Sequence, residues 1–80
     1  MLPTIRPGTI LAAYPYRFEH LKKGDLVLRR YMGGEVTHRL HGFVRGHGWQ
    51  TKGDNNDRTD WGYLTRENFL GLVVVVDPVR

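Results

Sequence analysis

Turn-forming residues recur at short intervals along this chain, and no segment between them has a convincing amphipathic helical pattern. Glycine, proline and aspartate gather at Pro7-Gly8, Pro15, Gly24-Asp25, Gly33-Gly34 and Gly46-His47-Gly48. The segments between these turns are short and rich in β-branched and aromatic residues. Turn signals spaced by roughly 8–12 residues are typical of hairpin-rich β proteins. The pattern therefore constrains the chain to an all-β fold.

The apolar segments mark the expected strands, at residues 10–14, 26–31, 35–44, 49–52 and 70–77. Residues 53–62 are expected to form a polar loop, and residues 65–69 one helical turn with Thr65 as its cap. A chain of 80 residues has room for one thin core. We predict a single small all-β domain over residues 1–80, built as a coiled antiparallel β-sheet or barrel.

Composition excludes several classes of protein. The chain has no cysteine, so neither a disulfide framework nor a thiolate zinc site can stabilise it. No apolar run approaches the roughly 20 residues of a membrane-spanning helix. We expect a cytoplasmic chain, with membrane association only if a longer gene product carries an upstream anchor. The net charge of +4 is scattered along the sequence, which indicates a solvated surface rather than a nucleic-acid site.

One histidine stands out because of the strand on which it lies. Strict alternation over residues 35–44 places Val36, His38, Leu40 and Val44 on one face, and Glu35, Thr37, Arg39, His41 and Phe43 on the other. His38 therefore projects from the more apolar face, whereas His41 is expected at the surface. A partly buried histidine that bonds a backbone carbonyl is the structural alternative to a functional one.

The polar loop gathers three carboxylates, at Asp54, Asp57 and Asp60. A calcium loop of the EF-hand type is excluded, because Arg58 and Thr59 stand where that pattern needs a ligand and a glycine. A turn whose side chains cap their own backbone explains the asparagines but not the carboxylates. A histidine with a nearby aspartate is the general base and its orienting partner in a serine-hydrolase triad.

Five short boxes occur in order along nearly the whole chain. They are residues 1–8 (Met-Leu-Pro-Thr-Ile-Arg-Pro-Gly), 23–27 (Lys-Gly-Asp-Leu-Val), 37–40 (Thr-His-Arg-Leu), 51–56 (Thr-Lys-Gly-Asp-Asn-Asn) and 71–74 (Gly-Leu-Val-Val). In this order they resemble the boxes of type I signal peptidases and LexA-like serine peptidases. The first box of that family reads Ser-Met-x-Pro-Thr-Ile-x-x-Gly-Asp, and the fourth reads Thr-Lys-Gly-Asp-Asn-Asn. Each box alone is weak, but five in order are specific.

The resemblance implies roles for individual residues. Endoplasmic-reticulum and archaeal members use a histidine in the His-Arg box as base, which makes His38 the general base here. Their triad aspartate lies six residues after the Gly-Asp-Asn-Asn aspartate, and Asp60 lies six residues after Asp54. Asp60 is thus the expected orienter and Asp54 a structural or auxiliary carboxylate. The strand just before His38 is the expected edge for an extended peptide.

The chain departs from the family at its first box. The family's serine would immediately precede Met1, and the sequence contains no serine at any position. Thr9 replaces the aspartate of the Pro-Gly-Asp turn, and Thr4 occupies a structural place in the motif rather than the place of a nucleophile. We therefore expect a peptidase core that is truncated at its N-terminus and inactive as it stands. Met1 is expected at the mouth of the groove that contains His38.

The leading hypothesis is a signal-peptidase-like serine endopeptidase domain that acts on a peptide or protein substrate. It needs no cofactor and no metal, and no nucleic acid is expected as a partner. One alternative is a pseudo-peptidase that binds extended peptides without cutting them. A less favoured alternative is a basic β-barrel that binds nucleic acid, with Trp49, Trp61 and the tyrosines as stacking platforms.

Overall fold

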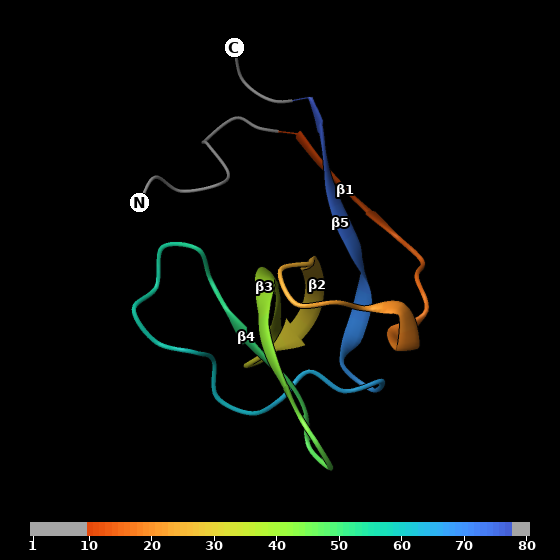
Figure 1. Cartoon of the computed structure of the whole chain (residues 1–80). Helices are drawn as coiled ribbons and strands as arrows, with labels where there is room; N and C mark the ends of the chain where they lie inside the picture. The colour runs from red at the N-terminus through yellow and green to blue at the C-terminus, as the bar shows by residue number, and fades with distance from the viewer. Residues whose placement is uncertain (1–9, 78–80) are drawn as a thin grey trace.

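The computed structural model describes residues 10–77, which form one antiparallel sheet of five strands. Short turns, loops and one turn of 3₁₀ helix connect the strands (Figure 1). In chain order the elements are β1 (Ile10–Tyr14), η1 (Phe18–His20), β2 (Leu26–Tyr31), β3 (Gly34–Val44), β4 (Gly48–Lys52) and β5 (Phe69–Asp77). The strand order across the sheet is β1-β5-β2-β3-β4. The predicted all-β class is confirmed.

The sheet is open rather than closed into a barrel. Its two edges are β1 and β4, which have no hydrogen bonds to each other in the described part of the chain. Of the two forms that the sequence allowed, a coiled sheet and a barrel, residues 10–77 therefore build the open sheet. No helix within these residues is long and apolar enough to cross a membrane.

The strands follow the sequence pattern closely. β1 and β2 have the predicted bounds, and β3, β4 and β5 each begin one residue earlier than predicted. Residues 65–69 form the expected single turn, in which the Thr65 carbonyl accepts hydrogen bonds from the amides of Asn68 and Phe69. The cap runs in the opposite direction to the expected one, because the Asn68 side chain accepts a hydrogen bond of 3.0 Å from the Thr65 amide.

The core occupies one face of the sheet. Leu21, Val27, Leu40 and Leu64 are its buried centre, and four partly buried side chains pack against them, namely Phe18, Trp49, Phe69 and Leu72. Trp49 is therefore part of the core packing, which removes it as a platform for nucleic-acid bases. Trp61, by contrast, is 85% exposed.

A β-bulge corrects the alternation predicted for β3. Leu40 pairs with Thr51 and Phe43 pairs with Trp49. Three steps along β3 are therefore matched to two steps along β4, which leaves one extra residue in β3. The extra residue turns Phe43 to the same face as Leu40, where strict alternation had put it on the opposite face. The ring of Phe43 accordingly meets that of Trp49 edge-on at 5.4 Å.

The strand before His38 is not an edge of the sheet. β2 pairs with β3 along its whole length and with β5 over Val27 to Arg29, so the predicted peptide-binding edge at this strand is wrong. The reason is topological: β5, the last strand in the chain, inserts between β1 and β2. The outer side of β4 is also partly occupied, because Trp49 forms a two-way bridge with Leu64.

Candidate active site

His38 lies on the strand next to the edge strand β4, on the core face of the sheet. It is on β3 opposite Val27 of β2, and two residues before the buried Leu40. Its side chain is 14% exposed, so the ring is held by its surroundings but still reaches solvent. The prediction that His38 projects from the apolar face is confirmed. His41 is exposed, as expected.

The polar loop brings Asp60 to this histidine. The Nδ1 atom of His38 and the Oδ2 atom of Asp60 are 2.5 Å apart, although 22 residues separate them in sequence. The Asp60 side chain is 4% exposed. An ionised carboxylate can only accept, so this contact requires a proton on Nδ1, and in the neutral ring Nε2 then presents its lone pair. The predicted meeting of these two side chains is confirmed.

Two further hydrogen bonds hold the Asp60 backbone in place. Its amide donates to the Thr51 carbonyl at 2.7 Å, which ties the loop to the outer side of β4. The next amide, that of Trp61, donates to the Tyr31 hydroxyl at 3.0 Å. The Tyr31 ring lies 6.0 Å from the His38 ring, centroid to centroid. Tyr31 therefore lies beside the His38 ring and bonds the residue that follows Asp60, a role that nothing in the sequence pattern had indicated.

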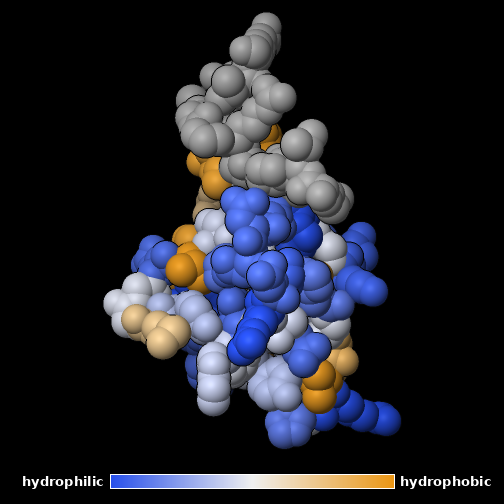
Figure 2. Space-filling view, turned by 90° about the vertical axis from the view of Figure 1, so that its left-hand side faces the viewer, coloured by the Kyte–Doolittle hydropathy of each residue, from blue (hydrophilic) through white to orange (hydrophobic). Residues whose placement is uncertain are grey.

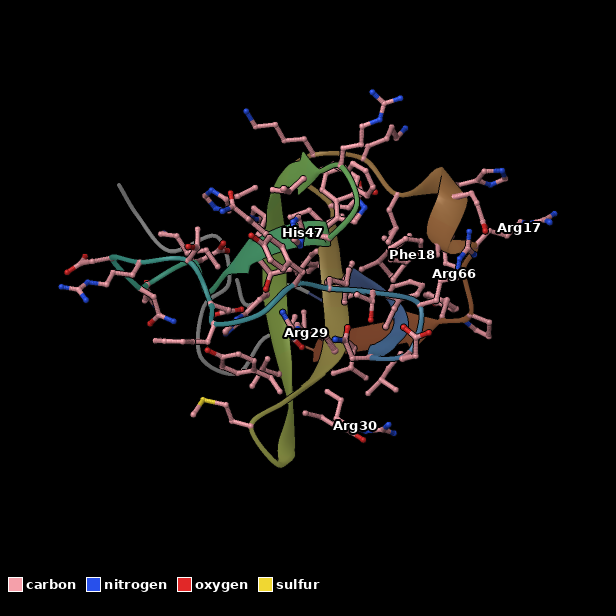
Figure 3. All side chains as sticks on the ribbon, turned by 90° about the horizontal axis from the view of Figure 1, so that it is seen from below. Arg17, Phe18, Arg29, Arg30, His47 and Arg66 are labelled. Carbon is pink, nitrogen blue, oxygen red and sulfur yellow. The ribbon has the colours of Figure 1, made fainter. Side chains whose placement is uncertain are left out.

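The Asp60 carboxylate has a second donor, which leads to a buried cation. The Thr51 hydroxyl donates to Asp60 Oδ2 at 2.5 Å, and Arg29 Nη1 donates to the Thr51 hydroxyl at 2.9 Å. Thr51 is fully buried and Arg29 is 3% exposed. Arg29 lies among the strands, whereas its neighbour Arg30 points away from them (Figure 3).

Sequence reasoning missed Arg29 because it stands in a pair of arginines that looks like a solvated charge cluster. The signal was the alternation of β2, which puts Arg29 on the face of Val27 and Tyr31. Burial lowers the pKa of the Arg29 guanidinium, while the negative charge of Asp60 acts in the opposite direction. The ring of Tyr31 lies 4.9 Å below the guanidinium and completes its enclosure.

Asp54 belongs to a different contact. Both of its carboxylate oxygens accept hydrogen bonds of 2.9 Å from the Arg39 guanidinium. Arg39 also donates to the Gly24 carbonyl at 2.8 Å, so it joins the start of the loop to the turn before β2. This bidentate contact raises the pKa of Arg39. The expectation of a structural carboxylate at Asp54 agrees with this geometry.

Nε2 of His38 faces the entry to the polar loop. A Cβ atom on Gly53 would lie only 2.9 Å from Nε2, so a glycine is needed for the ring to occupy this position. Within residues 10–77 no hydrogen bond occupies Nε2. An open hollow of about 480 Å³ adjoins the ring and is lined by Tyr31, His38 and residues 55–60. A reacting group can therefore approach the ring from this hollow.

The side of the molecule that carries this loop is polar. Figure 2 views the left-hand side of Figure 1, and hydrophilic residues fill the centre of that face. The described residues bring no group of three histidine, aspartate or glutamate side chains together in a way that could hold a metal ion. The predicted position of Met1 at the mouth of the groove falls outside residues 10–77.

Comparisons with known proteins leave the family open. Neither protein-family models, nor curated proteins, nor solved structures gave a match to this chain. The resemblance to signal peptidases and LexA-like peptidases thus rests on the five boxes of the sequence.

Proposed function

We propose that this chain is a serine-endopeptidase domain of the signal-peptidase/LexA type, in which His38 is the general base and Asp60 its orienting partner. The observation that carries the proposal is the 2.5 Å contact between His38 Nδ1 and Asp60 Oδ2. A triad histidine uses one ring nitrogen for the aspartate and the other for the nucleophile. Nε2 has no hydrogen bond among the described residues and belongs to a ring that lines an open hollow, which supports the second role.

The mechanism follows from this arrangement. A serine supplied directly before Met1, where the family keeps it, would attack a peptide carbonyl while Nε2 of His38 takes its proton. The imidazolium would then return the proton to the leaving amine, and Asp60 would stabilise the positive charge in between. Because the sequence contains no serine, the chain as printed is proposed to lack turnover. The hollow along residues 55–60 is where the reacting part of an extended peptide would lie.

The test is to supply the missing hydroxyl. The chain is extended by a Gly-x-Ser segment directly before Met1 and treated with a serine-directed phosphonate probe. We expect covalent labelling of the extended chain only. His38→Ala should abolish labelling and Asp60→Asn should reduce it by about 10²-fold or more, since the amide disturbs the tautomer of the ring. The matched controls are His41→Ala and Glu35→Gln, which change exposed residues of the strand that carries His38.

A second candidate function is peptide binding without cleavage. The absence of serine from the sequence favours it, because the His38–Asp60 pair alone cannot form an acyl intermediate. An extended chain that binds unstructured peptides but resists the probe would replace the peptidase proposal with this one. Labelling that depends on His38 would exclude it.

A further inference from the structure

We propose that Thr51 and the buried Arg29 are positioning residues of this site, which fix Asp60 as the acceptor for Nδ1 of His38. The inference deepens the proposed function and rests on it for its catalytic meaning. Arg29, Thr51 and Asp60 form a relay of two hydrogen bonds that ends at the base, and the relay sets which nitrogen of the base carries the proton.

The directions of the hydrogen bonds in the relay follow from the chemistry of its members. An arginine has donors only, so the Thr51 oxygen must accept from Arg29 Nη1 across 2.9 Å. The single hydroxyl proton of Thr51 is then free to point at Asp60 Oδ2, 2.5 Å away. Asp60 Oδ2 thus accepts two hydrogen bonds, one from the Thr51 hydroxyl and one from His38 Nδ1. The relay therefore holds that oxygen as an acceptor toward the ring.

Thr51 holds Asp60 in place through two hydrogen bonds. Thr51 bonds Asp60 through its hydroxyl and, through its carbonyl, accepts the Asp60 amide at 2.7 Å. Thr51 itself is opposite Leu40, two residues from His38 on the neighbouring strand. His38 on β3 and Thr51 on β4 are therefore held by neighbouring paired strands, and Thr51 holds Asp60 through two hydrogen bonds. The rest of the loop that carries Asp60 need not be rigid.

Burial argues that the relay serves the site rather than the fold. Arg29 and Thr51 are 3% and 0% exposed, on the face that carries Val27 and Leu40. Apolar residues of similar volume would pack on this face without the cost of desolvating a cation, and such replacements of buried ion pairs are often neutral or stabilising. We therefore expect the sheet to remain stable when both polar side chains are replaced together by apolar ones of similar volume, whereas the orientation of Asp60 depends on their hydrogen bonds.

The test uses the 80-residue chain itself and needs no added serine. The ¹⁵N chemical shifts of the His38 ring, measured at alkaline pH, give the fraction of the Nδ1–H tautomer. We expect this tautomer to dominate in the parent chain and to fall to a mixture in Thr51→Val, which keeps the shape but removes the hydroxyl. Thr51→Ser should restore the parent value. Thr37→Val, which removes a hydroxyl from the opposite face of the strand that carries His38, is the control.

A second variant covers the case in which Thr51→Val does not fold. Arg29→Met frees the Thr51 hydroxyl to rotate, so the Nδ1–H fraction should fall, while Arg29→Lys, which keeps a charged donor, should retain it. In the serine-extended chain, Thr51→Val should slow labelling by roughly 10-fold or more, since small misplacements of reacting groups are costly. Unchanged tautomer fractions in both Thr51→Val and Arg29→Met would overturn the relay. A changed tautomer together with an unlabelled serine-extended parent would support the relay and reject the peptidase.

Discussion

The chemistry of the candidate site depends on how single side chains are enclosed. His38 is partly exposed and has the nearly buried Asp60 on one side and the Tyr31 ring on the other. Behind Asp60 lie a fully buried hydroxyl and a buried guanidinium, each of which has a hydrogen-bond partner. The described residues leave no buried side-chain nitrogen or oxygen without a partner. A polar network that is fully satisfied can hold a carboxylate in one orientation, whereas a partly satisfied one cannot.

Gly53 offers the sharpest test of this packing at a single residue. In Gly53→Ala the new Cβ would lie 2.9 Å from His38 Nε2 and 2.7 Å from Asn56 Nδ2, so the ring or the amide must move. We expect the His38 ring resonances to shift and labelling of the serine-extended chain to fall by about 10-fold or more, since small misplacements of reacting groups are costly. Gly42→Ala on β3, whose new Cβ meets nothing closer than 4.0 Å, should leave both unchanged. Equal effects of the two substitutions would contradict the close approach.

The elements are joined by turns whose backbone geometry is demanding. β2 and β3 are connected by Met32 and Gly33, both at positive φ, 49° and 81°. Two residues at positive φ are the mark of a type I′ hairpin turn, whose twist matches that of the strands. Glycine adopts this conformation freely, but methionine does so at a cost because of its Cβ. The hairpin thus carries strain at one exposed residue, which is 84% accessible.

Relief of that strain should stabilise the protein. After glycine, asparagine is the residue that most readily takes positive φ at this turn position, so Met32→Asn should raise the free energy of unfolding by about 1 kcal/mol. Met32→Ile should lower it, since β-branching makes the left-handed conformation worse. Denaturation in urea measures both changes. If the two variants shifted the midpoint in the same direction, the turn assignment would be wrong.

The loop that delivers Asp60 is held at its entry by an ion pair. Arg39 and Asp54 are partly buried and bonded through two pairs of atoms, which makes this contact stronger than an ordinary surface pair. Asp54→Asn should lower the free energy of unfolding by about 1 kcal/mol. The Nδ1–H tautomer of His38 should persist, because Asp54 does not take part in the relay. Loss of that tautomer in Asp54→Asn would make Asp54 an auxiliary residue of the site instead of a structural one.

On the scale of the whole molecule, stability rests on few side chains. The buried apolar centre consists of Leu21, Val27, Leu40 and Leu64, within a chain of 80 residues. Proteins of this size have a total stability of roughly 4–12 kcal/mol. Leu64 is fully buried and comes from the segment after the polar loop, where it bridges to Trp49. Burial of Leu64 in the core therefore holds the C-terminal end of the loop that carries Asp60.

Removal of the Leu64 side chain should lower the free energy of unfolding of the whole domain. Leu64→Ala should cost about 2–5 kcal/mol, the range for emptying a well-packed site, and leave the protein close to unfolding at room temperature. Val75→Ala on β5, where the parent side chain is 42% exposed, should cost less than about 1 kcal/mol. Thermal or urea denaturation compares the two variants. A cost at Leu64 no larger than that at Val75 would show that the core lies elsewhere.

The local pattern of the sequence determined the strands and the pairing of His38 with Asp60. Alternation and turn residues predicted all five strands to within one residue, because both signals are local and the side-chain period of a strand is fixed. The choice of Asp60 over Asp54 and Asp57 came from spacing within a family-like box. It succeeded because Asp54 is taken by Arg39, an interaction with a residue only 15 positions away.

Only the tertiary structure decided the strand order, the face of Phe43 and the relay behind Asp60. The place of β5 between β1 and β2 is a long-range pairing that no local signal encodes, and it removed the expected edge beside His38. The bulge at β3 depends on how β4 pairs with it, so strict alternation misplaced Phe43. Arg29 looked like a surface charge because sequence records charge but not burial. Its burial arises only when β3, β4 and the loop close over it, which brings an arginine, a threonine and an aspartate from three separate segments into one network.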